Sequence, residues 1–238
     1  MVAKPPSTDR WADFPGHSKV RIHGMATQSL YPPPIEGYGL VLRPWDRELV
    51  AQVAAWSERG FPYHPFDLGY LRDRARAELH LARCHADGPH RHFVACEDGV
   101  AVGRVSVNLR DQSGLYLWSV HVPPEHAGRG VCRRMLAALM EWLEGEYVTP
   151  DFVLTSNTFA RHAHRAYTAL GFRVSETRWH FDREIAEQLW KVSAREREPI
   201  SHHIRFQNGR WEVQTHVFKR PRGTQMETAS PASVLRPA

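Results

Sequence analysis

Apolar runs bounded by turn residues predict strands in this chain, and longer segments with apolar residues three and four apart predict helices. Such runs predict strands at 39–45, 92–96, 102–107, 115–122, 152–157 and 178–181. The helical spacing predicts helices at 46–56, 68–85, 160–170 and 183–194, with Asp46 as the cap of the first. The mixture of strands and helices predicts an α/β (α+β) protein.

The C-terminal part of the chain carries a hairpin pattern. Residues 200–206 and 211–218 flank Asn208-Gly209, the dipeptide favoured in two-residue hairpin turns. We expect this hairpin and the helix before it to form an addition packed on the main domain. The predicted division is an extended or partly disordered arm at 1–38, a main domain at 39–181, the helix and hairpin at 182–220, and a flexible tail at 221–238.

The segment 119–136 carries the strongest chemical signal. It reads as a strand, a short loop with Gly128 and Gly130, and a helix that begins just after them. Backbone N–H groups at such a helix start, together with Arg129 and Arg133, suit a phosphate group. The loop lacks the Gly-Lys-Ser/Thr of a P-loop and the third glycine of a dinucleotide-binding fingerprint.

A second segment narrows the interpretation. Residues 127–132 (Ala-Gly-Arg-Gly-Val-Cys) and 167–172 (Tyr-Thr-Ala-Leu-Gly-Phe) stand in the order and spacing of two motifs of the GNAT superfamily of N-acetyltransferases, which residues 40–181 resemble. The chain departs from that family's pattern at Ala127, where Arg or Gln is usual, and at Cys132, where Gly or Ala is usual. Asn157 lies ten residues before Tyr167, whereas the family spacing is nearer seven.

The resemblance implies a mixed, mostly antiparallel sheet flanked by helices, and acetyl-CoA as the cosubstrate. It also implies that Tyr167 gives a proton to the departing CoA thiolate. The implied cofactor-binding residues are Val120, His121, Val122, Gly128, Arg129, Gly130, Val131, Cys132, Arg133 and Asn157.

The expected reaction is direct transfer of acetyl to a primary amine of a small molecule, such as an amino acid, a polyamine or an antibiotic-like amine. Three alternatives stay open: acetylation of a protein N-terminus, use of another acyl-CoA, and a non-catalytic binding module with the same fold. The aromatic segment 61–66 is the expected contact with the acceptor. The sequence names no general base, and a homodimer is a further option for the C-terminal hairpin.

The composition of the chain argues against several classes of partner and location. The net charge of +5 is spread along the chain with acids and bases interleaved, which disfavours nucleic acid as a partner. The 15 histidines and three cysteines have no metal-site spacing, so we expect no metal. No apolar run reaches the ~18 residues of a membrane span, and the N-terminus has no signal-peptide pattern. We therefore expect a cytoplasmic protein.

Overall fold

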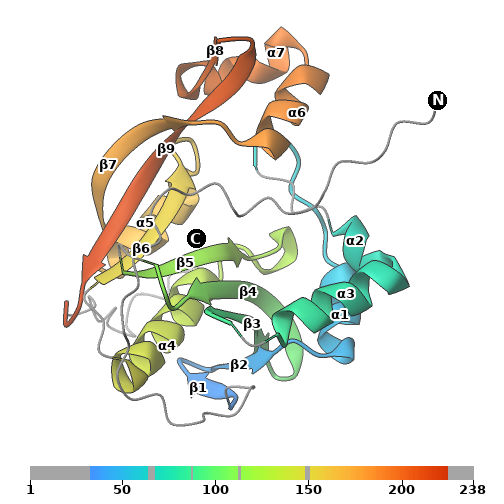
Figure 1. Cartoon of the computed structure of the whole chain (residues 1–238), viewed down its shortest axis with the longest axis vertical. Coiled ribbons are helices and arrows are strands. Elements are labelled where there is room, and N and C mark those ends of the chain that lie inside the picture. The colour runs from blue at the N-terminus through green and yellow to red at the C-terminus, as the bar shows by residue number, and fades with distance from the viewer. Residues whose placement is uncertain (1–32, 64–67, 87, 112–113, 148–150, 225–238) are drawn as a thin grey trace, which may run out of the picture.

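The strands of this protein form one mixed sheet with helices on both faces (Figure 1). A computed structural model describes residues 33–63, 68–86, 88–111, 114–147 and 151–224. The strands are β1 (Ile35–Gly37), β2 (Leu40–Pro44), β3 (His90–Glu97), β4 (Val100–Asn108), β5 (Leu115–His121), β6 (Asp151–Asn157), β7 (Arg173–His180), β8 (Ile204–Gln207) and β9 (Arg210–Pro221). The helices are α1 (Arg47–Ala54), α2 (Gly69–Arg72), α3 (Arg74–Cys84), α4 (Val131–Glu146), α5 (Arg161–Ala169), α6 (Arg183–Lys191) and α7 (Ala194–Arg197), with 3-10 turns at Pro124–His126 and Glu198–His203.

The strand order is β1-β2-β3-β4-β5-β6-β9-β7, and β8 pairs with β9 beside this path. Among the described strands, β5 and β6 form the one parallel pair, and every other pair is antiparallel. The predicted fold class, a mixed and mostly antiparallel sheet flanked by helices, is confirmed.

The centre of the sheet is buried on both faces, which explains its uninterrupted apolar runs. Successive side chains of β3 point to opposite sides. Phe93 and Ala95 join the core beneath α4 and α5, whereas Val94 and Cys96 join a second core beneath α1, α2 and α3. Helices therefore pack on both faces of the sheet at β3 to β5.

Local capping explains one helix that was predicted correctly and one that was not. Leu49 N–H donates to the Asp46 carboxylate at 2.8 Å, which confirms the predicted cap of α1. The single helix predicted at 68–85 is instead two helices, α2 and α3, that meet at Asp73. Extended backbone at Asp73 interrupts the helix, and its carboxylate accepts from Arg76 N–H at 2.9 Å to begin α3.

The C-terminal hairpin is present, and its second strand lies inside the sheet. Its turn is confirmed, since Gln207 faces Arg210 across Asn208-Gly209. The prediction that the core ends with a strand at 178–181 is wrong, because β7 spans 173–180 and β9 lies between β6 and β7. β9 is thus an inner strand of the sheet, and β8 is a short strand that pairs with the first residues of β9.

The structure also adds a strand to the segment expected to be an arm. Ile35 of β1 pairs with Leu42 of β2 and is buried. The remainder of the expected arm, residues 1–32, and residues 225–238 of the expected tail lie outside the described residues. The division into domains stays a prediction.

A third, smaller core belongs to the segment between β7 and β9. It is centred on Ile185 and Leu189 of α6 and on Val213 of β9. Phe61, from the segment after α1, and Phe159, from the turn after β6, pack against it. These two contacts fix the segment after α1 next to the C-terminal end of β6.

Candidate active site

The two parallel strands at the middle of the sheet separate along their length. Pairing between β5 and β6 is confined to residues 115–117 and 152–154, although both strands continue beyond. The Tyr116 hydroxyl and Thr155 Oγ1 lie 2.7 Å apart near the point where pairing ends. Beyond that point the edge of β5 that faces β6 has no strand partner among the described residues. The two strands therefore leave a gap between them beyond Leu117 and Leu154.

A bulge in β5 reorients the end of that strand. Two residues, Ser119 and Val120, stand opposite one residue of β4, and Ser119 has a φ of 52°. His121 is buried against the ring of Trp56, with centroids 5.6 Å apart, whereas Val120 and Val122 pack toward α4. His121 therefore faces the opposite side of the sheet from its two neighbours.

The glycine loop leads directly into α4. Gly128 and Gly130 have φ values of 77° and 73°, a region in which glycine is strongly favoured. Gly130 is the N-cap of α4, and no side chain hydrogen-bonds to the first turn in its place. A Cβ at either glycine would meet no atom within 4 Å, so the loop is open to a ligand. Exposed N–H groups at the start of a 16-residue helix fit a pyrophosphate.

The arginines of this loop are already partly engaged. One carboxylate, Glu97 at the end of β3, pairs with both Arg129 and Arg134, the latter at 2.8 Å. The other terminal nitrogen of Arg129 lies 3.1 Å from His126 Nδ1. The Arg134 hydrogen bond lowers the pKa of Glu97 below its ordinary value. Arg133, in the first turn of α4, is partly exposed. The contribution of Glu97 could not be expected from the sequence, because it lies 32 residues before Arg129.

Cys132 and Tyr167 lie next to one another under the loop. The Cys132 side chain packs against the core rather than into the loop opening, and burial raises its pKa to about 12. Tyr167 is 5% exposed, and its ring contacts Phe218 at 5.5 Å. Burial, and then the nearby Cys132, raise the pKa of Tyr167 well above its ordinary value. The Tyr167 phenol is therefore protonated across the neutral range.

Asn157 is the last residue of β6 and stands opposite Thr215 of the neighbouring strand β9. Its side-chain oxygen accepts from Thr215 Oγ1 at 3.4 Å, and its backbone oxygen accepts from Ala160 N–H at 2.9 Å. The residue seven positions before Tyr167 is Ala160, which is the N-cap of α5. The role of Asn157 in cofactor binding stays a prediction.

The segment after α1 lies across the end of β5. Arg59 donates to the carbonyl oxygen of Val122 at 3.3 Å and lies 3.5 Å from the ring of His162 at the start of α5. Tyr63 meets the same ring edge-on, with centroids 5.0 Å apart. Of the segment 61–66 expected to contact the acceptor, residues 64–66 lie outside the described residues. Arg59 could not be expected here from the sequence, because only the fold brings it to His162, 103 residues away.

The described residues also bear on metal binding and on membrane insertion. Within the described part of the chain, no group of three His, Cys, Asp or Glu residues is arranged to hold a metal ion. No described helix is both long enough and apolar enough to cross a membrane.

A family comparison identifies the chain. The model of the acetyltransferase (GNAT) family matches residues 40–172, which include the glycine loop, both separated strands and Tyr167. The chain belongs to the GNAT acetyltransferase family. It is therefore an acetyltransferase enzyme that depends on acetyl-CoA. No curated protein sequence matches it.

Solved structures share the fold of this acetyltransferase at low sequence identity. A chimera of the spermidine N-acetyltransferase SpeG from Vibrio cholerae and hSSAT is 16% identical with a TM-score of 0.54, covering 77% of this chain and 96% of its own. The microcin C7 self-immunity acetyltransferase MccE, in complex with acetyl-CoA and AMP, is 10% identical with a TM-score of 0.53 and coverages of 77% and 92%. The ribosomal-protein-S18-alanine N-acetyltransferase from Escherichia coli is 14% identical with a TM-score of 0.50 and coverages of 80% and 99%. Their acceptors differ, so the shared fold leaves the acceptor open.

Proposed function

We propose that this acetyltransferase moves the acetyl group of acetyl-CoA to the primary amine of a small molecule, such as an amino acid, a polyamine or an antibiotic-like amine. The observation that carries the proposal is the way the segment after α1 lies over the end of β5. Arg59 of this segment donates to the carbonyl oxygen of Val122 and contacts His162, and Phe61 packs against the core that contains α6. These contacts hold the segment across the end of β5, and we take a covered site of this kind to favour a small acceptor over a folded protein.

The donor would lie along the unpaired edge of β5. We assign the backbone of Val120, His121 and Val122 to the pantetheine arm, because the arm can pair with this edge as an added strand would. The residues assigned to the pyrophosphate follow the gap directly in the sequence; they are Gly128, Arg129, Gly130, Val131, Cys132 and Arg133. The open space at both glycines supports this assignment.

The reaction forms a C–N bond and breaks a C–S bond, while the amine loses one proton and the CoA sulfur gains one. Acetyl-CoA supplies the activated thioester, and the protein holds both reactants in one gap. For well-oriented partners such positioning lowers the barrier by roughly 7–11 kcal/mol at the upper end. The binding gap itself is therefore expected to be the main source of rate.

Tyr167 is the proposed partner of the departing thiolate. Its raised pKa keeps the phenol protonated, so it can donate a hydrogen bond to the sulfur as negative charge develops. Full proton transfer from so weak an acid to a thiolate is uphill. The hydrogen bond therefore stabilises the charge first, and the proton moves as the product leaves.

The test compares Tyr167→Phe with Tyr147→Phe. Tyr147 is the C-cap of α4, at the end of that helix away from the glycine loop. We expect Tyr167→Phe to lower kcat by about tenfold or more while the Kd for acetyl-CoA stays within about twofold, since general-acid roles contribute about 10²–10⁴. The Tyr147→Phe variant should match the wild type. An unchanged kcat in Tyr167→Phe would remove Tyr167 from the mechanism.

The acceptor is tested separately by thiol release from acetyl-CoA. The panel holds free amino acids, spermidine, an aminoglycoside and a short peptide with a free N-terminus. Turnover with at least one small amine is the expected result. Turnover confined to the peptide would refute the small-molecule proposal and favour the protein N-terminus.

A further inference from the structure

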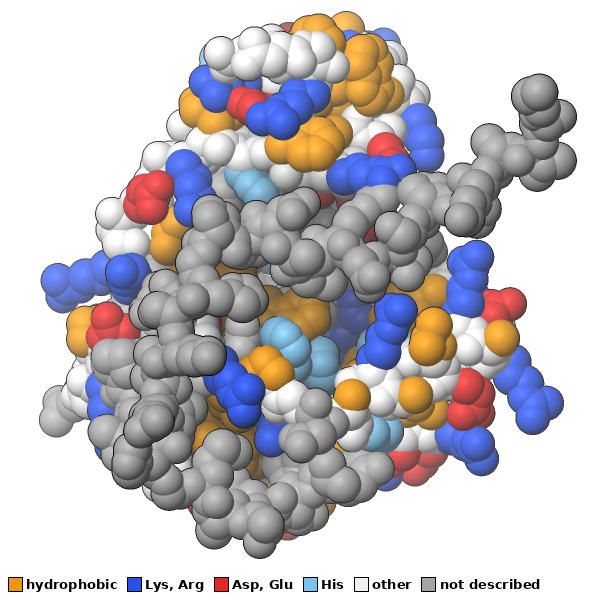
Figure 2. Space-filling model, in the orientation of Figure 1, with side chains coloured by type: hydrophobic (Ala, Val, Ile, Leu, Met, Phe, Trp, Pro, Cys, Tyr) orange, Lys and Arg blue, Asp and Glu red, His pale blue; other side chains and the backbone are white. Residues whose placement is uncertain are grey.

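The outer end of the segment between β7 and β9 carries an exposed aromatic cluster. Trp190 of α6 is 63% exposed and Phe206 of β8 is 51% exposed. Each ring meets the other and the ring of Trp211, with centroids 5.3–6.3 Å apart. Figure 2 shows apolar side chains at this end of the molecule, beside both basic and acidic side chains. Large apolar side chains gathered at the surface mark an interaction site.

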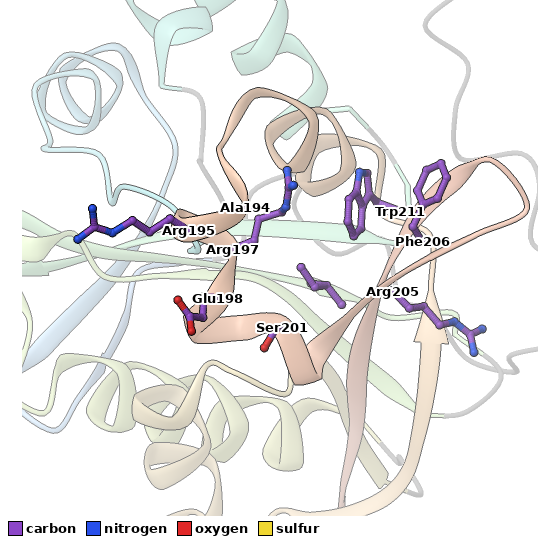
Figure 3. A pocket seen from close by; sticks show the side chains of 9 residues that line it. Ala194, Arg195, Arg197, Glu198, Ser201, Arg205, Phe206 and Trp211 are labelled. Carbon is purple, nitrogen blue, oxygen red and sulfur yellow. The ribbon is translucent and has the colours of Figure 1, made fainter.

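A hollow of about 560 Å³ lies beside this cluster, between α7 and β8. Arg195 and Arg197 line it from α7, and Phe206 and Trp211 line it from the hairpin. Figure 3 shows Arg197 and Trp211 close together, and the Arg197 guanidinium carbon is 5.1 Å from the centre of the indole ring. The hollow is large enough for one or two side chains of a partner and is open to solvent.

The strand that borders the hollow has an open edge. Among the described strands, β8 pairs with β9 alone. Gln207 and Arg210 flank a two-residue turn, so in a hairpin they form the first hydrogen-bonded pair, and such pairs alternate along the strands. The backbone groups of Arg205 and Gln207 therefore point toward β9, and those of Ile204 and Phe206 point away from it. An extended peptide can pair with such an edge.

The charges around the hollow are mainly positive. Three arginines line it, at 195, 197 and 205, against one carboxylate at Glu198. Arg205 shares the carboxylate of Glu212 with Arg210, which leaves that cluster with one positive charge. Neither Arg195 nor Arg197 forms an ion pair with a described carboxylate: one nitrogen of Arg197 donates to the carbonyl oxygens of Leu189 and Val192, each at 2.7 Å, and the nearby Glu196 is engaged in capping α7. This balance complements an acidic partner.

We propose that an acidic peptide in extended conformation docks on the open edge of β8. Its backbone pairs with Ile204 and Phe206, an apolar side chain enters the hollow beside Trp211, and its carboxylates face Arg195 and Arg197. The site stands outside the acetyl-transfer gap, so the proposal is independent of the acceptor proposed above.

The binding test uses the full chain and a fluorescein-labelled heptapeptide in which glutamate alternates with valine or leucine. We expect polarisation to report saturable binding that weakens about tenfold in Arg195→Glu and in Phe206→Lys, each of which loses one arm of the site. Matched controls are Arg83→Glu on α3 and Val174→Lys on β7, both far from the hollow. A heptapeptide with lysine in place of glutamate should bind at least about tenfold more weakly.

Amide hydrogen exchange then tests the pairing itself. Binding should slow exchange at Ile204 and Phe206, while Arg205 and Gln207, already bonded to β9, change little. Absence of binding, equal binding of the two peptides, or protection at Arg205 and Gln207 alone would overturn the proposal. So would a concentration-dependent dimer in sedimentation that Phe206→Lys abolishes, because the edge would then receive a second copy of this chain.

Discussion

Replacing Gly130 by Asp should weaken acetyl-CoA binding through charge, and Gly130→Asn isolates that charge. Gly130 has a φ of 73° and caps α4, and a Cβ there would meet no atom within 4 Å. Asp and Asn have nearly the same shape and both tolerate positive φ better than other side chains. The two variants therefore share the backbone strain and the added volume, and differ by one negative charge.

The size of the charge effect follows from Coulomb's law. Two like charges about 4 Å apart repel by about 1 kcal/mol in bulk water and by about 4 kcal/mol at an effective dielectric constant of about 20. The exposed loop lies between these limits, so Gly130→Asp should bind acetyl-CoA about tenfold to a few hundredfold more weakly than Gly130→Asn. The shared strain of up to about 1–2 kcal/mol should lower both Tm values by several degrees.

Calorimetric titration with acetyl-CoA at low salt measures the two affinities, and a thermal scan measures the two Tm values. The ratio of affinities should shrink as salt is added, because the loop is exposed to solvent. Equal affinities of Gly130→Asp and Gly130→Asn at low salt would refute the reasoning and remove the pyrophosphate from this loop.

Three further outcomes are expected. Burial lowers the pKa of His80, His92 and His164 from 6.5 to about 4. The stability that these histidines contribute is therefore complete above about pH 6.5 and falls as the pH drops toward 4. Urea melts should show a loss of up to about 1 kcal/mol per histidine per pH unit, and His92→Gln should reduce that loss. Gly114→Ala places a Cβ 2.4 Å from the carbonyl oxygen of Asp151, at the start of the parallel pair, and urea melts should show a loss of about 2 kcal/mol or more, whereas Gly60→Ala should be neutral. Glu97→Gln removes a carboxylate beside the loop and frees Arg129, so the KM for acetyl-CoA should fall a few-fold at low salt, and an unchanged KM would show that Glu97 does not compete with the cosubstrate.

Local chemistry explains which parts of the fold could be predicted. The Asp46 cap, the Asn208-Gly209 turn and the buried run of β3 each depend on a few neighbouring residues, and each is where the sequence places it. The position of β9 depends instead on which distant strand it pairs with, as in the pairing of Asp151 with Pro221. An apolar alternation shows that a strand forms but does not name its partner. Strand β1 was missed because three residues after a run of prolines carry too short a pattern.

The candidate site likewise combines features that depend on adjacent residues with features that depend on distant ones. Gly128 and Gly130 could be found because a turn before a helix leaves a signature in adjacent residues. The clamp of Glu97 on two arginines, and the meeting of Arg59 with His162 103 residues away, exist only after the sheet has formed. The conformation of the glycine loop thus depends on adjacent residues, whereas the charged groups around it are brought together by the fold.

The position of β9 has a consequence for synthesis on the ribosome. Until residues 210–221 have left the exit tunnel, β7 has no strand to pair with among the described strands, and β6 has only its short parallel pairing with β5. The gap between β5 and β6 has β6 as its second wall, and that wall gains its own partner strand only with almost the last described element of the chain. A nascent chain that stalls before residue 210 would expose two open strand edges, which makes it prone to aggregation. Acetyl-CoA binding should consequently be absent from ribosome-bound chains in which residues 210–221 have not yet left the exit tunnel.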